Sequence, residues 1–164
     1  MVEFVDETEA TPVAAAPVEA GRAPWHLWAV GILSLGWNLI GVTDYTLTQL
    51  GNPIWISAAA DNMGITADEM IAYVDSFPVW LHAFWALGVW GAVLGSILLL
   101  LRKRLAVWSF GVSLLGLAVT QLYRVFTPQP AWMDKDLALN LMLWSIATFL
   151  VIYAGSMRNK GVLR

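Results

Sequence analysis

The sequence predicts an all-α integral membrane protein, a bundle of four transmembrane helices with a short helix on its outer surface. Three observations indicate this fold class. Four apolar stretches each contain about 20 residues, the length a helix needs to cross a bilayer. Hydrophobic residues make up 59% of the chain and charged residues 13%, whereas soluble domains carry about 25% charged residues. The 164 residues include ten tryptophans, a tryptophan-rich composition that suits the membrane interface.

The first 23 residues differ from the rest of the chain. They contain five acidic side chains and an Ala/Pro/Val stretch with Pro12 and Pro17. A signal peptide would have a basic start and a long apolar run, and this segment has neither. Its polar, Pro-containing composition is typical of disorder. We therefore expect residues 1–23 to form a disordered acidic tail.

The apolar stretches define a transmembrane domain over residues 24–157. The expected spans are residues 25–47, 79–101, 105–126 and 137–157. Strands of a membrane barrel would alternate polar and apolar residues, but the second stretch ends in an unbroken run of apolar side chains. Helices satisfy their own backbone hydrogen bonds in lipid, so each stretch is expected to be helical.

The connection over residues 51–78 is the longest and contains no Lys or Arg. Gly51, Asn52 and Pro53 are expected to stop the first helix. Thr66 and Glu69 have the spacing of a capping box, which predicts a short outer helix over residues 67–76. The spacing of the acidic side chains in this connection matches no calcium-binding loop, so we interpret them as solvated.

The distribution of basic residues predicts the orientation. Seven of the nine Lys and Arg residues fall on one side of a four-span topology, including those of residues 102–104 and of a short basic tail over residues 158–164. Only Arg124 and Lys135 fall on the other side. By the positive-inside rule, both termini are expected to be cytoplasmic, in a bacterial inner (plasma) membrane.

Several short motifs resemble a known group of proteins. The motifs are Pro24–Trp28, Gly36–Asn38, Asp44–Tyr45, Phe77–Pro78, Trp85–Gly91, Gly95–Ser96 and Gly161–Arg164. Together they resemble small four-helix bacterial membrane proteins that are often labelled sugar transporters. The resemblance extends over most of residues 24–164. It implies four transmembrane helices and a role in transport.

Polar residues within membrane spans often mark functional sites, and here they gather in the outer halves of the four predicted helices. They are Asn38, Asp44, Tyr45, His82, Gln121, Arg124 and Asn140. At about 1.5 Å per residue, Asp44 and Arg124 lie at similar depths, so we expect them to pair. Two interpretations stay open. The two charges stabilise the helices or reach the surface, or the polar set lines an outward-open pocket for a small polar solute, floored by Trp37, Trp85 and Trp144.

Other chemistry has little support in the sequence. There is no cysteine, and His26 and His82 lie at opposite ends of the bundle, so we expect no metal site and no cofactor. Motifs for phosphate binding or a nucleophile are absent, as is a basic stripe for nucleic acid. We therefore expect a protein that is not an enzyme.

The partners expected from the sequence are the lipid bilayer, a small polar solute, and either further copies of the chain or a larger membrane complex. The leading functional hypothesis is a small-solute, sugar-like transporter that acts as an oligomer, because four helices rarely enclose a path with two gates. The alternative is a non-catalytic accessory or scaffold subunit of a larger membrane complex.

Gly91 and Gly95 have the spacing of a close helix–helix contact.

Overall fold

The computed structural model describes residues 23–133 and 137–164, and its regular structure in these residues is helical. The expected disordered tail lies almost wholly outside them. Four helices are long and apolar enough to cross a membrane, which confirms the predicted fold class. They are α1 (Trp25–Gln49), α4 (Val79–Leu100), α5 (Leu105–Phe126) and α6 (Leu137–Asn159). Helices α1, α4 and α5 begin at the residue that the sequence predicts, α6 is described from Leu137 onward, and each of the four ends within two residues of its predicted end.

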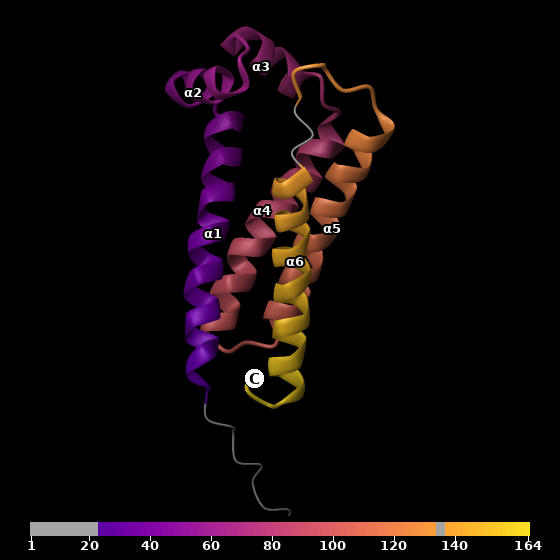
Figure 1. Cartoon of the computed structure of the whole chain (residues 1–164). Helices are drawn as coiled ribbons and strands as arrows, with labels where there is room; N and C mark the ends of the chain where they lie inside the picture. The colour runs from indigo at the N-terminus through magenta and orange to yellow at the C-terminus, as the bar shows by residue number, and fades with distance from the viewer. Residues whose placement is uncertain (1–22, 134–136) are drawn as a thin grey trace, which may run out of the picture.

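The helices pack in chain order (Figure 1). Helix α4 lies between α1 and α5, and α6 packs against α5. Two shorter helices, α2 (Pro53–Met63) and α3 (Ala67–Asp75), cover the end that we call the outer end. Helices α1 and α6 meet near the other, inner end, where His26 Nδ1 and the Tyr153 hydroxyl form a hydrogen bond. This arrangement is an open bundle with its least-packed side between α1 and α6.

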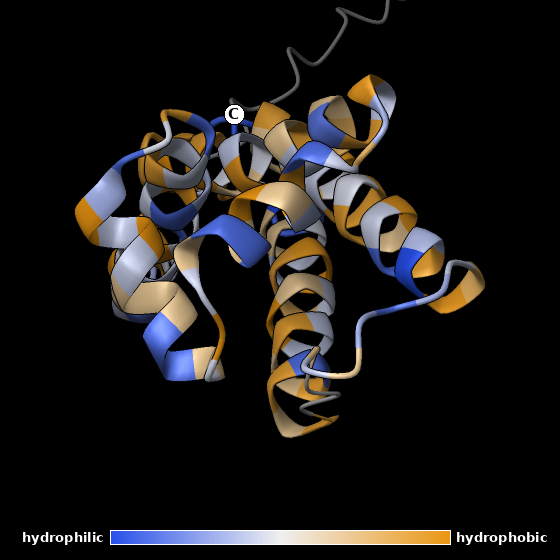
Figure 2. Cartoon of the chain, turned by 90° about the horizontal axis from the view of Figure 1, so that it is seen from above, coloured by the Kyte–Doolittle hydropathy of each residue, from blue (hydrophilic) through white to orange (hydrophobic). Residues whose placement is uncertain are grey.

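Large apolar side chains cover the outside of the four long helices. Leu33, Trp108, Val125 and Ile152 are each more than 60% exposed, and orange apolar segments occur around the bundle in the view along its axis (Figure 2). Exposed apolar area on this scale is unfavourable in water. It is what a helix bundle presents to lipid, where the backbone is satisfied within each helix.

The closest helix contact joins α4 to α5 through small residues. The Ser113 hydroxyl donates to the Gly88 carbonyl at 2.6 Å, and the Ser109 hydroxyl donates to the Gly91 carbonyl at 2.9 Å. A Cβ added at Gly91 would lie 3.3 Å from Ser109 O, and one added at Gly95 would lie 2.6 Å from the Phe110 ring. The predicted close packing at these two glycines is therefore confirmed.

The outer connection contains two helices, whereas the sequence analysis expected one. Helix α3 and its capping box are as predicted: Glu69 N donates to Thr66 Oγ1, and Thr66 N donates to Glu69 Oε2 at 2.8 Å. Helix α2 was missed because Asn52 and Pro53 were interpreted only as a stop. They also start a helix, since Asn52 Oδ1 accepts from Trp55 N at 3.0 Å and proline is favoured in a first turn.

Residues 161–164 fold back to close the inner end. Helix α6 continues to Asn159, and the chain then turns through Gly161, whose φ is 69°. Arg164 N donates to Arg102 O at 2.7 Å, and Arg104 N donates to Arg164 O at 3.0 Å. Leu163 is 0% exposed and belongs to the core cluster of the inner end. The predicted basic tail is thus an ordered part of the bundle.

Candidate functional site

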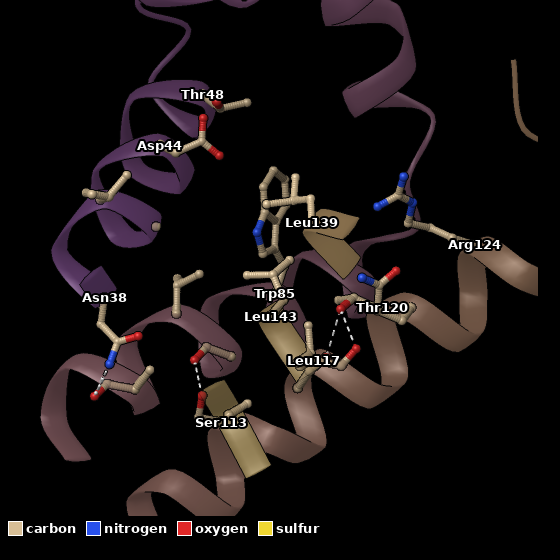
Figure 3. Close-up of a pocket in the computed structure, with 18 of the residues that line it drawn as sticks. Asn38, Asp44, Thr48, Trp85, Ser113, Leu117, Thr120, Arg124, Leu139 and Leu143 are labelled. Carbon is tan, nitrogen blue, oxygen red and sulfur yellow. Dashed lines mark hydrogen bonds between the residues drawn. The ribbon is translucent and has the colours of Figure 1, made fainter. Parts of the chain in front are cut away.

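Between the helices, toward the outer end of the bundle, lies a partly open cavity of about 710 Å³, which we call the main cavity. All four long helices line it, and α2 and α3 contribute to its outer end. Its walls are mostly apolar and include Trp37, Trp85, Leu117, Leu139 and Leu143; Figure 3 labels the last four of these. This volume lies within the range of about 300–1,000 Å³ that is typical of ligand sites.

Of the three tryptophans expected to floor a pocket, two belong to the wall of the main cavity. Trp37 and Trp85 line the main cavity. Trp144 does not line it and is 37% exposed on α6. The ring of Trp85 occupies the space between the α1 and α5 walls (Figure 3). It also packs edge-on against Tyr45, with ring centroids 5.0 Å apart.

Of the seven polar residues that the sequence analysis grouped, four line the main cavity. They are Asn38, Asp44, Gln121 and Arg124. Tyr45 and His82 are not among its lining residues. Gln49 Nε2 donates to His82 Nδ1 at 3.1 Å, so His82 joins α4 to α1 at the outer end. Asn140 lines a neighbouring pocket instead.

Asn38 is a helix contact as well as a lining residue. Its Nδ2 donates to Ala92 O at 3.2 Å and to Ser96 Oγ at 3.0 Å. Ser96 is fully buried and donates in turn to Ala92 O. Interhelical hydrogen bonds of this kind hold membrane helices together, so the Asn38 amide group fixes α1 on α4.

The expected ion pair between Asp44 and Arg124 does not form, and that prediction is wrong. Within the described residues Asp44 accepts a hydrogen bond from Trp55 Nε1 at 3.1 Å, which ties α1 to α2. Asp44 and Arg124 lie on opposite walls of the main cavity (Figure 3). The reason is the packing order: α4 lies between α1 and α5, so equal depth does not bring the two side chains together.

A second pocket, which we call the outer pocket, adjoins the main cavity beside α5. Its volume is about 810 Å³, and Thr127, Gln129 and Asn140 line it. Gln121 and Arg124 line both spaces. Gln121 Nε2 donates to Asn140 Oδ1 at 2.7 Å, which joins α5 to α6 at this level. The outer pocket is the more polar of the two, because about half of its described lining residues are polar, whereas most of those of the main cavity are apolar.

Arg124 is half-buried and makes no hydrogen bond or ion pair within the part of the chain that the structure describes. It interacts electrostatically with Tyr73 on α3. Burial raises the pKa of the Tyr73 hydroxyl, and the positive charge of Arg124 opposes this rise. The Tyr73 hydroxyl donates to Gln129 Oε1 at 2.7 Å. The guanidinium therefore remains available to a ligand.

Sequence reasoning missed Tyr73 and Gln129 as site residues. Tyr73 lines the main cavity beside Met70 and Val74, which lie three residues before it and one after it on α3. That helical spacing was the available signal, because it places these residues on the face of α3 that covers the bundle. Gln129 lies in an irregular connection, where no periodic pattern marks the side that faces the protein.

The deeper hydroxyl groups of the main cavity are already satisfied by the protein. The Ser113 hydroxyl donates to Gly88 O, and the Thr120 hydroxyl donates to Gly116 O at 3.0 Å and Leu117 O at 2.9 Å. The charged groups lie nearer the outer end. Among residues 23–133 and 137–164, no cluster of three metal-ligating side chains occurs. The arrangement can hold a molecule with an apolar body and a polar end.

No protein-family model, curated protein or solved structure matches the chain.

Proposed function

We propose that the protein is a carrier that binds a small amphipathic solute in the main cavity and transports it across a bacterial inner membrane, with both termini cytoplasmic. One observation supports this most directly. The main cavity extends inward from the outer end of the bundle and stops at Phe110 and Leu150, which belong to the apolar core of the inner end. Such one-sided access is what a carrier needs when it binds its solute from one side.

The filling of the inner half comes from a continuous apolar core. Leu27, Leu99, Phe110 and Leu163 are each at most 2% exposed and belong to one cluster. The main cavity begins above this cluster, and Phe110 is part of both. Release to the inner side would require the cluster to rearrange. Alternating access in transporters works by rocking or gating of one part of the bundle against another.

The lining of the main cavity suits a less polar solute than the sugar-like one that the sequence suggested. A sugar is bound by many hydrogen-bonding groups, but in the main cavity the Asn38 amide nitrogen and the Ser113 and Thr120 hydroxyls already donate to protein acceptors. Apolar side chains form most of the remaining wall. Partly apolar solutes suit this lining better, because burial of apolar surface supplies most of the binding energy in such a site.

The resemblance of the sequence to small proteins labelled transporters also favours transport. A carrier of four helices would act as an oligomer, since neighbouring copies can supply the surface against which the bundle moves. No step of this function requires a covalent intermediate, so we propose no enzymatic activity.

The proposed function can be tested by filling the main cavity. Ala147 lines it from α6, whereas Ser145 is an exposed residue of the same helix outside it. In proteoliposomes, Ala147→Phe should abolish uptake of a transported solute, because the ring occupies the binding space. Ser145→Phe should transport normally. Equal uptake by the two variants would contradict binding in the main cavity.

The open side between α1 and α6 favours a second candidate function. A membrane helix of a larger complex can lie along that side and insert its side chains into the main cavity, which would make the chain an accessory or scaffold subunit. Crosslinking through Ile40→Cys, a lining residue that is 64% exposed, would then capture a larger protein. A purified chain that binds no solute, together with such a crosslink, would favour this alternative.

A further inference from the structure

We infer that the ligand is an anionic amphiphile whose head group binds Arg124 in the outer pocket and whose apolar tail lies in the main cavity. This inference rests on the proposed function and names the class of molecule that the site accepts. Its head would be a carboxylate or a phosphate, and its tail an alkyl or similarly apolar chain.

The two adjoining spaces have the form of an amphiphile. The main cavity is walled mostly by apolar side chains, and the outer pocket is walled about equally by polar and apolar residues. Gln121, Arg124 and Met133 line both, so the guanidinium lies at the boundary between the apolar and polar spaces. A ligand that fills both spaces must change from apolar to polar at the level of Arg124.

The charge at that boundary selects an anion. A guanidinium binds carboxylate or phosphate oxygens through paired, charge-assisted hydrogen bonds. Arg124 has no hydrogen-bonding or ionic partner among the described residues, and an unpaired charge in a membrane span is unfavourable. An anionic head would therefore stabilise the site. The Tyr73 hydroxyl and the Gln129 amide nitrogen already donate to Gln129 Oε1 and to Thr127, so the guanidinium is the group that would bind the head.

Asp44 orients the ligand. Its carboxylate belongs to the opposite wall of the main cavity, where Trp55 Nε1 holds it. It repels an anion near α1, whereas Arg124 attracts one near α5. The head group is thus expected beside α5, and the tail is expected to extend past Trp85 toward Leu143 (Figure 3).

The tail can enter from the surrounding bilayer. Ile40 on α1 and Leu139 on α6 both line the main cavity, and both are well exposed, at 64% and 45%. The lining therefore reaches the flank of the bundle between these two helices. Arg124 lies two residues before the end of α5, close to the depth of lipid head groups. The same chemistry can thus come from a membrane lipid or from a single-chain amphiphile in solution.

The experiment compares two probes with the same tail and different heads. The full chain is placed in nanodiscs of phosphatidylcholine, and the quenching of its tryptophan fluorescence by ω-bromoundecanoate and by ω-bromoundecanol is titrated. The carboxylate should bind more tightly than the alcohol. Arg124→Gln should weaken carboxylate binding by about tenfold or more and leave alcohol binding unchanged, whereas Arg124→Lys should retain part of the preference. Arg158→Gln, at the inner end, is the matched control and should behave as the wild type.

A second measurement covers the opposite wall and does not depend on removal of the arginine. Asp44→Asn should tighten carboxylate binding, because it removes the repelling charge. Weaker binding in this variant would contradict the assigned orientation. Native mass spectrometry after purification from nanodiscs that also contain phosphatidylglycerol identifies the source. Retention of that lipid by the wild type, and not by Arg124→Gln, would identify a membrane lipid as the ligand. Binding of the carboxylate alone would identify a single-chain amphiphile.

The outcomes separate this inference from the proposed function. Equal affinity for the two probes, unchanged by Arg124→Gln but abolished by Ala147→Phe, would overturn the anionic head and leave the carrier proposal standing. Quenching that Ala147→Phe does not change would show that neither probe occupies the main cavity, and both proposals would then fail.

Discussion

The contact between α4 and α5 provides a sharp test of how the bundle is held together. A Cβ added at Gly116 would lie 2.5 Å from both Gly88 N and Phe84 O. These are backbone atoms, so no change of rotamer can relieve the overlap. Gly111 is on the same helix, and a Cβ added there would meet nothing within 4 Å. Gly116→Ala and Gly111→Ala are therefore a matched pair.

The expected magnitude follows from the geometry. To reach an ordinary contact of 3.4 Å, the two helices must separate by roughly 0.9 Å near Gly116. Overpacking of this kind costs about 1–3 kcal/mol, and loss of the Ser113–Gly88 hydrogen bond adds about 0.6 kcal/mol. The higher helix propensity of alanine offsets up to about 1 kcal/mol. Gly116→Ala should thus lower the free energy of unfolding by about 1–3 kcal/mol, whereas Gly111→Ala should leave it unchanged or raise it slightly.

The assay is reversible unfolding in mixed micelles, in which sodium dodecyl sulfate is titrated and helix content is followed by far-UV circular dichroism. Both variants remove one glycine from α5, so their difference isolates the contact with α4. Equal free energies of unfolding for the two variants would refute the close approach at Gly116.

Three further predictions concern other parts of the chain. An impermeant thiol reagent should label Ser57→Cys but not Lys103→Cys in intact cells, because the basic turn is expected inside; the chain has no native cysteine, and the reverse pattern would invert the topology. Leu163→Ala should lower the free energy of unfolding by about 2–5 kcal/mol, since Leu163 is 0% exposed, and Leu101→Ala, at a side chain that is 60% exposed, should have a much smaller effect. Hydrogen bonds from the Thr66 backbone and hydroxyl hold the pKa of Glu69 below its ordinary value of 4.5, so their contribution to α3 is present above pH 4.5 and is lost as the pH falls below it. Amide exchange in α3 should accelerate over that range in the wild type but not in Glu69→Gln.

Much of the fold could be predicted because a bilayer constrains helices strongly. Length and composition were enough to place four spans, and the basic turn at 102–104 separates the second span from the third. Helix α2 was not predicted, because Asn52-Pro53 can end one helix and begin the next. The sequence predicts a tail for residues 161–164 because Arg164 is basic. Val162 and Leu163 before it are apolar, and the structure buries both.

The candidate site could be predicted only in part. The rise per residue gives the depth of a side chain in a span, and Asn38, Asp44, Gln121 and Arg124 do line one cavity. Depth does not give the direction in which a side chain points or the order in which helices pack. The same missing information explains why Asp44 and Arg124 were wrongly paired and why Trp144 was placed in a pocket that it does not line.

The folding back of residues 161–164 has a consequence for how the protein is made. These residues follow all four spans in the chain, so they reach the turn at Arg102–Arg104 only after α6 has entered the membrane. Until then Leu27 and Leu99 lack part of the core that surrounds them in the finished bundle. Membrane insertion and completion of the inner core are therefore separate events in biogenesis, and a chain that ends before Val162 would span the bilayer with its inner end unfinished.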